Sequence, residues 1–146
     1  MSQKTLPAFS IQDTRLLSAH FDVNRSFSPG PDVKVEVKIT INHTWHQDSK
    51  ILQVSDIVNV TGNESPFNLL VEYGGMFLFE DEVPAPNEIV RIAEINCATI
   101  LFPFVREAIA EITRRAGIGQ MLLQPMNFVE LYSTNHPDEA VTLPTE

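Results

Sequence analysis

The first half of the chain alternates between apolar and polar residues with a period of two. Because a strand turns alternate side chains to opposite faces, this pattern predicts strands with one buried and one solvated face. Two residues disturb it: Asp56 interrupts the buried side of the third run, and Leu70 puts an apolar residue on the solvated side of the fourth. The four runs are residues 17–24, 32–41, 52–60 and 67–73.

Turn-forming residues separate these runs, at 28–31, 47–49 and 62–66. Short links between amphipathic strands predict an antiparallel meander with one wet face. Gly74 and Gly75 are expected to break the fourth strand, as a bulge or a point of close backbone approach. An acidic, proline-containing crossover at residues 80–86 then carries the chain across the sheet.

The second half changes to a helical period. Apolar residues between 105 and 116 recur at steps of three and four, so one stripe of a helix faces the core. We expect this helix to begin after Phe102, with Pro103 in its first turn, and to end at Gly117. A shorter segment follows at 127–132.

These elements predict an α+β fold, a four-stranded antiparallel sheet with helices packed on one face. The length suits one domain, residues 1–146. Its core is expected at about residues 9–132, with a loose acidic tail at 133–146.

Composition narrows the class of protein. A net charge of −9 argues against nucleic acid, whose phosphates an acidic surface would repel. No apolar run reaches the ~18 residues of a membrane span, and the first nine residues do not resemble a secretory signal. We therefore expect a cytoplasmic protein without membrane insertion. The lone Cys97 is expected to be a small buried residue.

The chain offers little for catalysis. His43 and His46 are more simply solvated turn residues than a metal pair, and Glu111 is spaced for surface ion pairs with Arg114 and Arg115. No nucleophile has a neighbouring base in sequence. The sequence predicts no catalytic residue, no metal and no cofactor.

Large apolar residues occur in excess of what the core pattern needs. They either close the core and an oligomer interface, or line a groove for extended peptides in which flexible methionines accept varied partners. The excess residues lie in an unbroken run at 76–79 and in a C-terminal group: Leu122, Leu123, Met126, Phe128, Leu131 and Tyr132.

Three blocks in order resemble one family. Residues 96–107 read Asn-Cys-Ala-Thr-Ile-Leu-Phe-Pro-Phe-Val-Arg-Glu, similar to an Ile-Leu-Phe-Pro-Tyr-x-Arg-Glu signature with Phe104 in place of tyrosine. Residues 72–77 resemble the same family's Gly-Gly-hydrophobic-Phe segment, and residues 123–128 resemble its Leu-x-Pro-Val-Asn-Phe segment. The family is the SecB protein-export chaperones, and the resemblance extends from about Phe9 to Tyr132.

The resemblance implies a dimer of dimers that holds unfolded precursor polypeptides in hydrophobic grooves and passes them to the export motor SecA. It implies that Val105, Ile109 and Ile112 help to join the dimers. By the same resemblance, candidates for polypeptide binding are Met76, Phe77, Phe79, Phe128, Leu131 and Tyr132. We add Leu122 and Met126 from the C-terminal group of excess apolar residues.

The resemblance also places a SecA contact on the solvated face of the sheet, at Asp22 and Glu72. Ser18 and Leu70 stand where the family usually has acids. A SecB-like chaperone of a toxin–antitoxin system, acting without SecA, is therefore an alternative. A second alternative, from another class, is an oligomeric α+β domain that binds a small ligand in an enclosed cavity.

Overall fold

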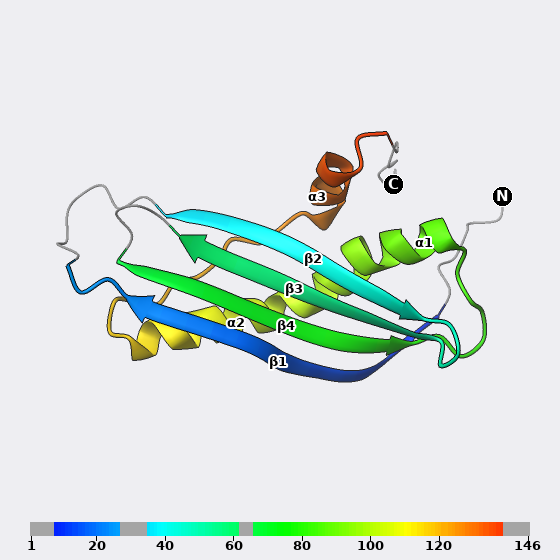
Figure 1. Ribbon diagram of the computed structural model, residues 1–146, viewed down its shortest axis with the longest axis horizontal. Helices are drawn as coiled ribbons and strands as arrows, with labels where there is room; N and C mark the ends of the chain where they lie inside the picture. Colours follow the sequence, from blue (N-terminus) through cyan, green and yellow to red (C-terminus); the bar gives the residue numbers. More distant parts are fainter. Residues whose placement is uncertain (1–7, 27–34, 62–65, 139–146) are drawn as a thin grey trace.

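The computed structural model describes residues 8–26, 35–61 and 66–138, and its central element is a four-stranded antiparallel sheet (Figure 1). The order across the sheet is β1-β4-β3-β2. The predicted fold class is confirmed. The strands are β1 (Ser10–Val23), β2 (Glu36–His46), β3 (Ile51–Thr61) and β4 (Phe67–Leu78).

The predicted meander is correct for β2, β3 and β4 but wrong for β1, which pairs with β4 instead of β2. The expectation assumed that the link between β1 and β2 is too short to cross other strands. Residues 24–35 are long enough to cross β4 and β3, because neighbouring strands are spaced about 4.8 Å apart. In this position Phe21 of β1 stacks on Phe67 of β4, with ring centroids 5.5 Å apart. The turn predicted at 28–31 lies outside the described residues.

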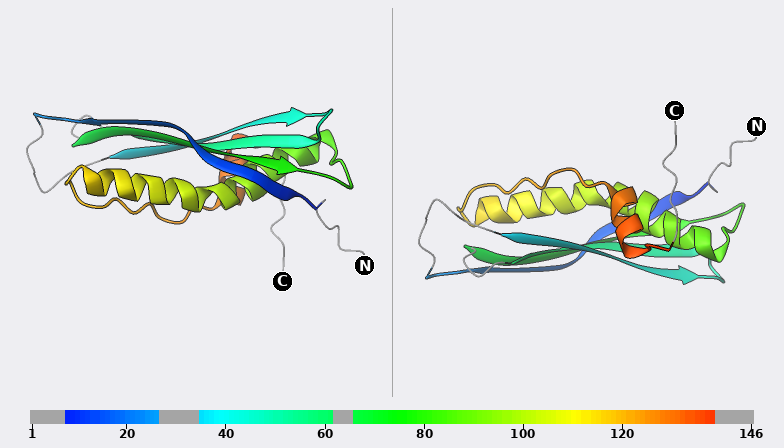
Figure 2. Two further views of the ribbon diagram at one scale, coloured as in Figure 1. Left: turned by 90° about the horizontal axis from the view of Figure 1, so that it is seen from below. Right: turned by 90° about the horizontal axis from the view of Figure 1, so that it is seen from above.

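Helices cover one face of the sheet only (Figure 2). Three abutting segments form most of this layer: α1 (Pro86–Arg91), the π-helical η1 (Ile92–Cys97) and α2 (Ala98–Arg115). The predicted start after Phe102 is wrong, and Pro103 lies inside α2. The helix extends upstream because Ile92 and Leu101 are fully buried in the core between sheet and helices, and this burial offsets the backbone hydrogen bond that proline cannot make.

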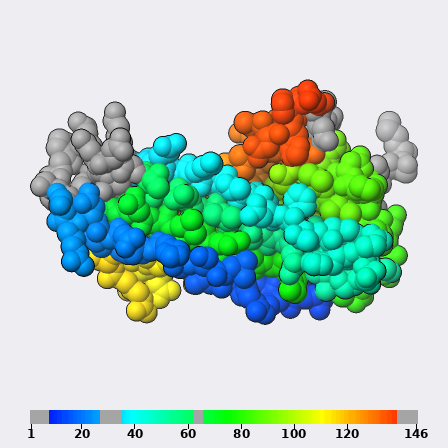
Figure 3. Space-filling view, viewed as in Figure 1, coloured from blue at the N-terminus to red at the C-terminus, as the bar shows by residue number. Residues whose placement is uncertain are grey.

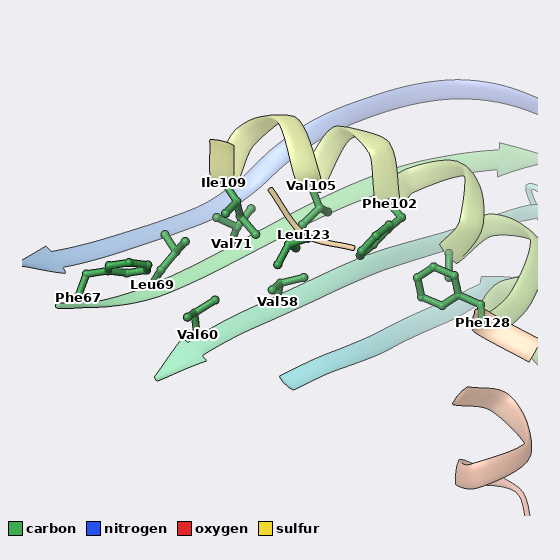
Figure 4. Packing of buried hydrophobic residues seen from close by; sticks show 11 residues of the cluster. Val58, Val60, Phe67, Leu69, Val71, Phe102, Val105, Ile109, Leu123 and Phe128 are labelled. Carbon is green, nitrogen blue, oxygen red and sulfur yellow. The ribbon is translucent and has the colours of Figure 1, made fainter. Parts of the chain in front are cut away.

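The core lies between the sheet and the helices, as the alternation requires. Val58 and Val60 of β3 and Val71 of β4 are fully buried, and Val105 and Ile109 of α2 pack against the same cluster (Figure 4). The helical stripe inferred from the sequence therefore faces the sheet.

The strand break predicted at Gly74 and Gly75 is wrong, because β4 continues through both, but the alternative of a close approach to the backbone there is confirmed. The irregularity is in β1, whose register shifts between Leu16 and Ser18. It places Leu17 over Gly74 so closely that a Cβ there would lie 2.6 Å from the Leu17 Cδ1 atom. The extra residue moves Leu17 to the helix-free face, although the period of two in residues 17–24 predicts that it shares a face with Phe21.

Residues 118–127, which we call the return segment, run along the far side of α2 from the sheet (Figure 2). Gly117 ends the helix with φ of 73°, as expected for a left-handed terminator. The Met121 amide donates a hydrogen bond to the Thr113 hydroxyl (2.8 Å), and Arg106 Nε donates to the Leu123 carbonyl (2.9 Å). Two polar contacts therefore hold the segment to α2.

Helix α3 (Phe128–Asn135) follows, and the Asn127 side chain caps it by accepting from the amides of Val129 and Glu130. The helix is longer than the predicted 127–132. Beyond it, His136 Nε2 lies 2.6 Å from the Glu94 carboxylate of η1, so the chain is anchored past residue 133, where a loose tail was expected. Residues 139–146 lie outside the described part.

Candidate functional site

The three predicted binding residues near the double glycine do not share a surface. Met76 and Phe77 belong to β4 rather than to the crossover, so they point to opposite faces. Phe77 and Phe79 are fully buried in the core, whereas Met76 is partly exposed on the helix-free face.

The five C-terminal candidates lie on the helix side. Phe128 and Tyr132 are 3% and 1% exposed, and the Phe128 ring packs edge-on against Phe102 at 5.4 Å. Met126 and Leu131 are partly buried, and Leu122 is 64% exposed. In this conformation, an incoming chain can reach Leu122, Met126 and Leu131.

Partly buried apolar side chains pack beside these aromatics, and four of them were not among the predicted binding residues: Phe9, Ile39, Ile41 and Trp45. Trp45 of β2 contacts Phe79 at 5.8 Å, and Phe9 contacts Phe77 and Phe79 at 5.5 and 5.3 Å. Trp45 has the same alternating phase as the apolar residues of β2, which was the available signal. We call this set the apolar rim: Phe9, Ile39, Ile41, Trp45, Met126 and Leu131.

A second apolar surface lies where α2 passes the edge strand β1. Leu16 and Phe104 are 48% and 38% exposed, and the Phe104 ring stacks on Tyr73 at 5.3 Å. Val105 and Ile109, assigned by resemblance to the contact between dimers, are fully buried against their own sheet. Ile112, the third residue of that prediction, is partly buried against the same core, and Phe104 is an exposed large apolar side chain of this helix.

The residues predicted to contact SecA lie on the helix-free face, shown toward the viewer in Figure 3. Asp22 pairs with Asn68 across β1 and β4, and Ser18 pairs with Glu72. Leu70 lies between these rows, on the face opposite the buried Leu69 and Val71. The sequence-based placement of Leu70 on the solvated face is confirmed.

A depression of about 280 Å³ adjoins these rows on the helix-free face. Most of the residues that line it are of polar types, Arg15, Gln53 and Glu72 among them, and Leu17 and Met76 lie beside them. Arg15 pairs with Asp13, and the Ser55 hydroxyl donates to Glu72 at 2.8 Å. Two pairs of its polar side chains therefore bind each other.

The described residues contain no group of three or more His, Cys, Asp or Glu side chains placed to hold a metal ion. None of the helices in residues 8–26, 35–61 and 66–138 has the length and apolar character to cross a membrane.

The family model and the similar proteins that match this chain point to the same family. Residues 5–139 match the model of the family described as preprotein translocase subunit SecB. A protein-export protein SecB of Paramagnetospirillum magneticum is 29% identical over 103 residues, 70% of this chain and 64% of its own length. One of Methylobacillus flagellatus is 29% identical over 147 aligned positions, 95% of this chain and 90% of its own length.

Among solved structures, a SecB-like chaperone of Mycobacterium tuberculosis, in complex with a ChAD peptide from the HigA1 antitoxin, is similar in fold. It superposes with a TM-score of 0.70 at 17% identity, covering 82% of this chain and 91% of that one. At this identity the similarity establishes the shared fold.

Proposed function

Because the chain belongs to the SecB family, we propose that it is an ATP-independent holdase that binds non-native polypeptides and keeps precursors competent for the Sec translocase. The match over residues 5–139 is the observation that carries this proposal. We further propose that it works in the cytoplasm as a homotetramer, without a cofactor or a catalytic step.

The apolar rim supports polypeptide binding. It combines methionine, leucine and aromatic side chains that are partly accessible, a composition that adapts to varied partners. We propose that Leu122 and Leu131 make the first contacts with a client. In this proposal Phe77, Phe79 and Tyr132 become contacts only when the helix layer moves away from the sheet.

Suppression of aggregation tests the holdase function. An unfolded model protein is diluted from denaturant with or without the chain, in the absence of ATP, and light scattering is followed. We expect protection at about one tetramer per client, as the resemblance implies. Lack of protection at a large molar excess would refute the proposal.

A pair of variants tests the surface. Leu122→Ser with Leu131→Ser removes apolar contact from the proposed binding side, so protection should weaken several-fold. Leu17→Ser is the matched control, because Leu17 is 52% exposed on the helix-free face. Equal loss in both proteins would show that binding does not use the proposed side.

The antitoxin-type alternative is favoured by one observation on this chain, the apolar Leu70 among the residues proposed to contact SecA. Leu70→Glu restores an acid there and should strengthen binding of the zinc-bearing SecA tail, measured by calorimetry. Unchanged or weaker binding contradicts a SecA site on this face. A co-purifying antitoxin, without SecA binding, would support the alternative.

The small-ligand alternative makes a different prediction. A discrete compound should then co-purify, detectable by native mass spectrometry, and denatured chains should not bind. Such a ligand would be sought in the depression beside Glu72.

A further inference from the structure

The core is divided into two clusters, and a single row of the sheet separates them. Ile41, Asp56 and Tyr73 are paired across β2, β3 and β4 in this row. Ile41 and Tyr73 pack against both clusters. Asp56 lies between Ile41 and Tyr73, and its side chain is on the helix-covered face. We call this row of three residues the seam.

Asp56 has no accessible surface, and neither carboxyl oxygen has a hydrogen-bond partner within the described structure. A buried polar group without partners is costly, and a buried charge costs more. Burial raises the pKa of Asp56 from 3.8 to about 8, so the closed protein keeps the carboxyl protonated at neutral pH.

The least regular part of the helix layer, the π-helical η1, lies next to the seam. The π-helical η1 ends at Cys97, whose thiol pKa is raised by burial and by the nearby Asp56. Such π-helical turns are rare and are often found at functional sites. The preceding α1 has only six residues and no side-chain hydrogen bond at its N-cap, Ala85. This end of the layer has little local stability of its own.

The ionisable groups around the seam do not neutralise Asp56. Tyr73 of β4 and Cys97 of η1 are acids, and His43 lies one row along β2, beside Val54. Two charged groups of the helix layer have partners elsewhere: Glu94 contacts His136, and Arg106 of α2 donates to the Leu123 carbonyl.

We propose that the seam is a pH-sensitive hinge: when Asp56 ionises, α1 and η1 separate from the strands and uncover Phe77, Phe79 and Cys97, while α2 stays on the larger cluster. That the uncovered aromatics then meet a client rests on the proposed function, but the hinge itself does not.

The sign and size follow from proton linkage. In the open state Asp56 is hydrated and ionises near its ordinary 3.8, whereas in the closed state it ionises near 8. Opening therefore releases a proton throughout this interval, and the opening equilibrium constant should rise about tenfold per pH unit up to about pH 8.

Cys97 reports this opening directly, since it is the single cysteine of the chain and is buried. A thiol reagent reacts only with the open state, and below its pKa the exposed thiolate fraction also rises about tenfold per pH unit. Between about pH 5.5 and 7.5, the labelling rate of the native protein should therefore rise about a hundredfold per unit. The rate must be proportional to reagent concentration, which shows that closing is faster than labelling.

The decisive variant is Asp56→Asn, which resembles the protonated side chain but cannot ionise. Its labelling rate should rise only about tenfold per pH unit, whereas the control Asp48→Asn, an exposed turn residue, should behave as the wild type. A tenfold rise in the wild type, or a hundredfold rise in Asp56→Asn, overturns the proposal. Should Asp56→Asn fail to fold, Asp56→Leu must give the same tenfold rise.

Urea separates the hinge from global unfolding. An opening limited to α1 and η1 exposes much less surface than complete unfolding, so the labelling rate should rise with urea concentration much less steeply than the unfolding equilibrium constant. A steep dependence, equal to that of equilibrium unfolding, would overturn the local hinge. No client is present in these measurements, so they can fail independently of the proposed function.

Discussion

Replacing Asp56 by asparagine should stabilise the folded protein, and the gain should depend on pH. The folded protein holds the Asp56 proton more tightly than the unfolded chain, with a pKa of about 8 against 3.8. Wild-type stability therefore benefits fully below about pH 4 and declines as the pH rises toward 8. An asparagine has no such proton, so this decline should disappear.

The magnitude can be worked from the two pKa values. A pH of 7 is about 3 units above the pKa of the Asp56 carboxyl in the unfolded chain, 3.8, and each unit corresponds to about 1.4 kcal/mol of stability. The difference between variant and wild type should be on the order of 4 kcal/mol at pH 7 and close to zero near pH 4. For a chain of this size, that is ~10 °C in melting temperature.

Urea denaturation at pH 4.5, 6 and 7.5 measures this, with protomer concentration held fixed because oligomers gain stability by mass action. Asp48→Asn serves as the control, since it also replaces an aspartate by asparagine, but at an exposed position. Parallel curves for wild type and Asp56→Asn would refute the reasoning, because they would mean that Asp56 is hydrated or paired in the folded protein.

Two further predictions concern stability and use the same denaturation assay. Gly75→Ala should destabilise by about 1–3 kcal/mol, because its Cβ would lie 3.1 Å from both Leu101 and Phe77 in the core; Gly74→Ala should cost less, since Leu17 can move aside into solvent, and equal costs would contradict this. Asn127→Ala should cost about 1 kcal/mol by removing the cap of α3, and amide exchange should accelerate in α3 but not in α2; unchanged exchange in α3 would contradict the capping role.

Much of the fold was predictable because burial leaves a direct pattern in the sequence. The period-two runs located all four strands, and the spacing of Val105 and Ile109 identified the face of α2 that packs on the sheet. Asp56 stood out for the same reason, as a charge in a buried phase. These are local signals that need no knowledge of neighbouring strands.

The remaining errors come from contacts between distant segments. Nothing near β1 indicates that it pairs with β4 or that an extra residue there turns Leu17 to the other face. Pro103 indicated a helix start, because the burial of Ile92 and Leu101 that extends the helix upstream depends on the sheet beneath them. Met76 and Phe77 were grouped by hydrophobicity, although the pleat of β4 separates them.

The return segment also fixes where α3 lies along the molecule. Its second hydrogen bond to α2 is at the Leu123 carbonyl, and α3 is capped at Asn127. Only three residues lie between these two points, and an extended residue spans at most about 3.6 Å. Deleting one of them would draw the helix back along α2, whereas lengthening the chain before Met121 would leave its position unchanged.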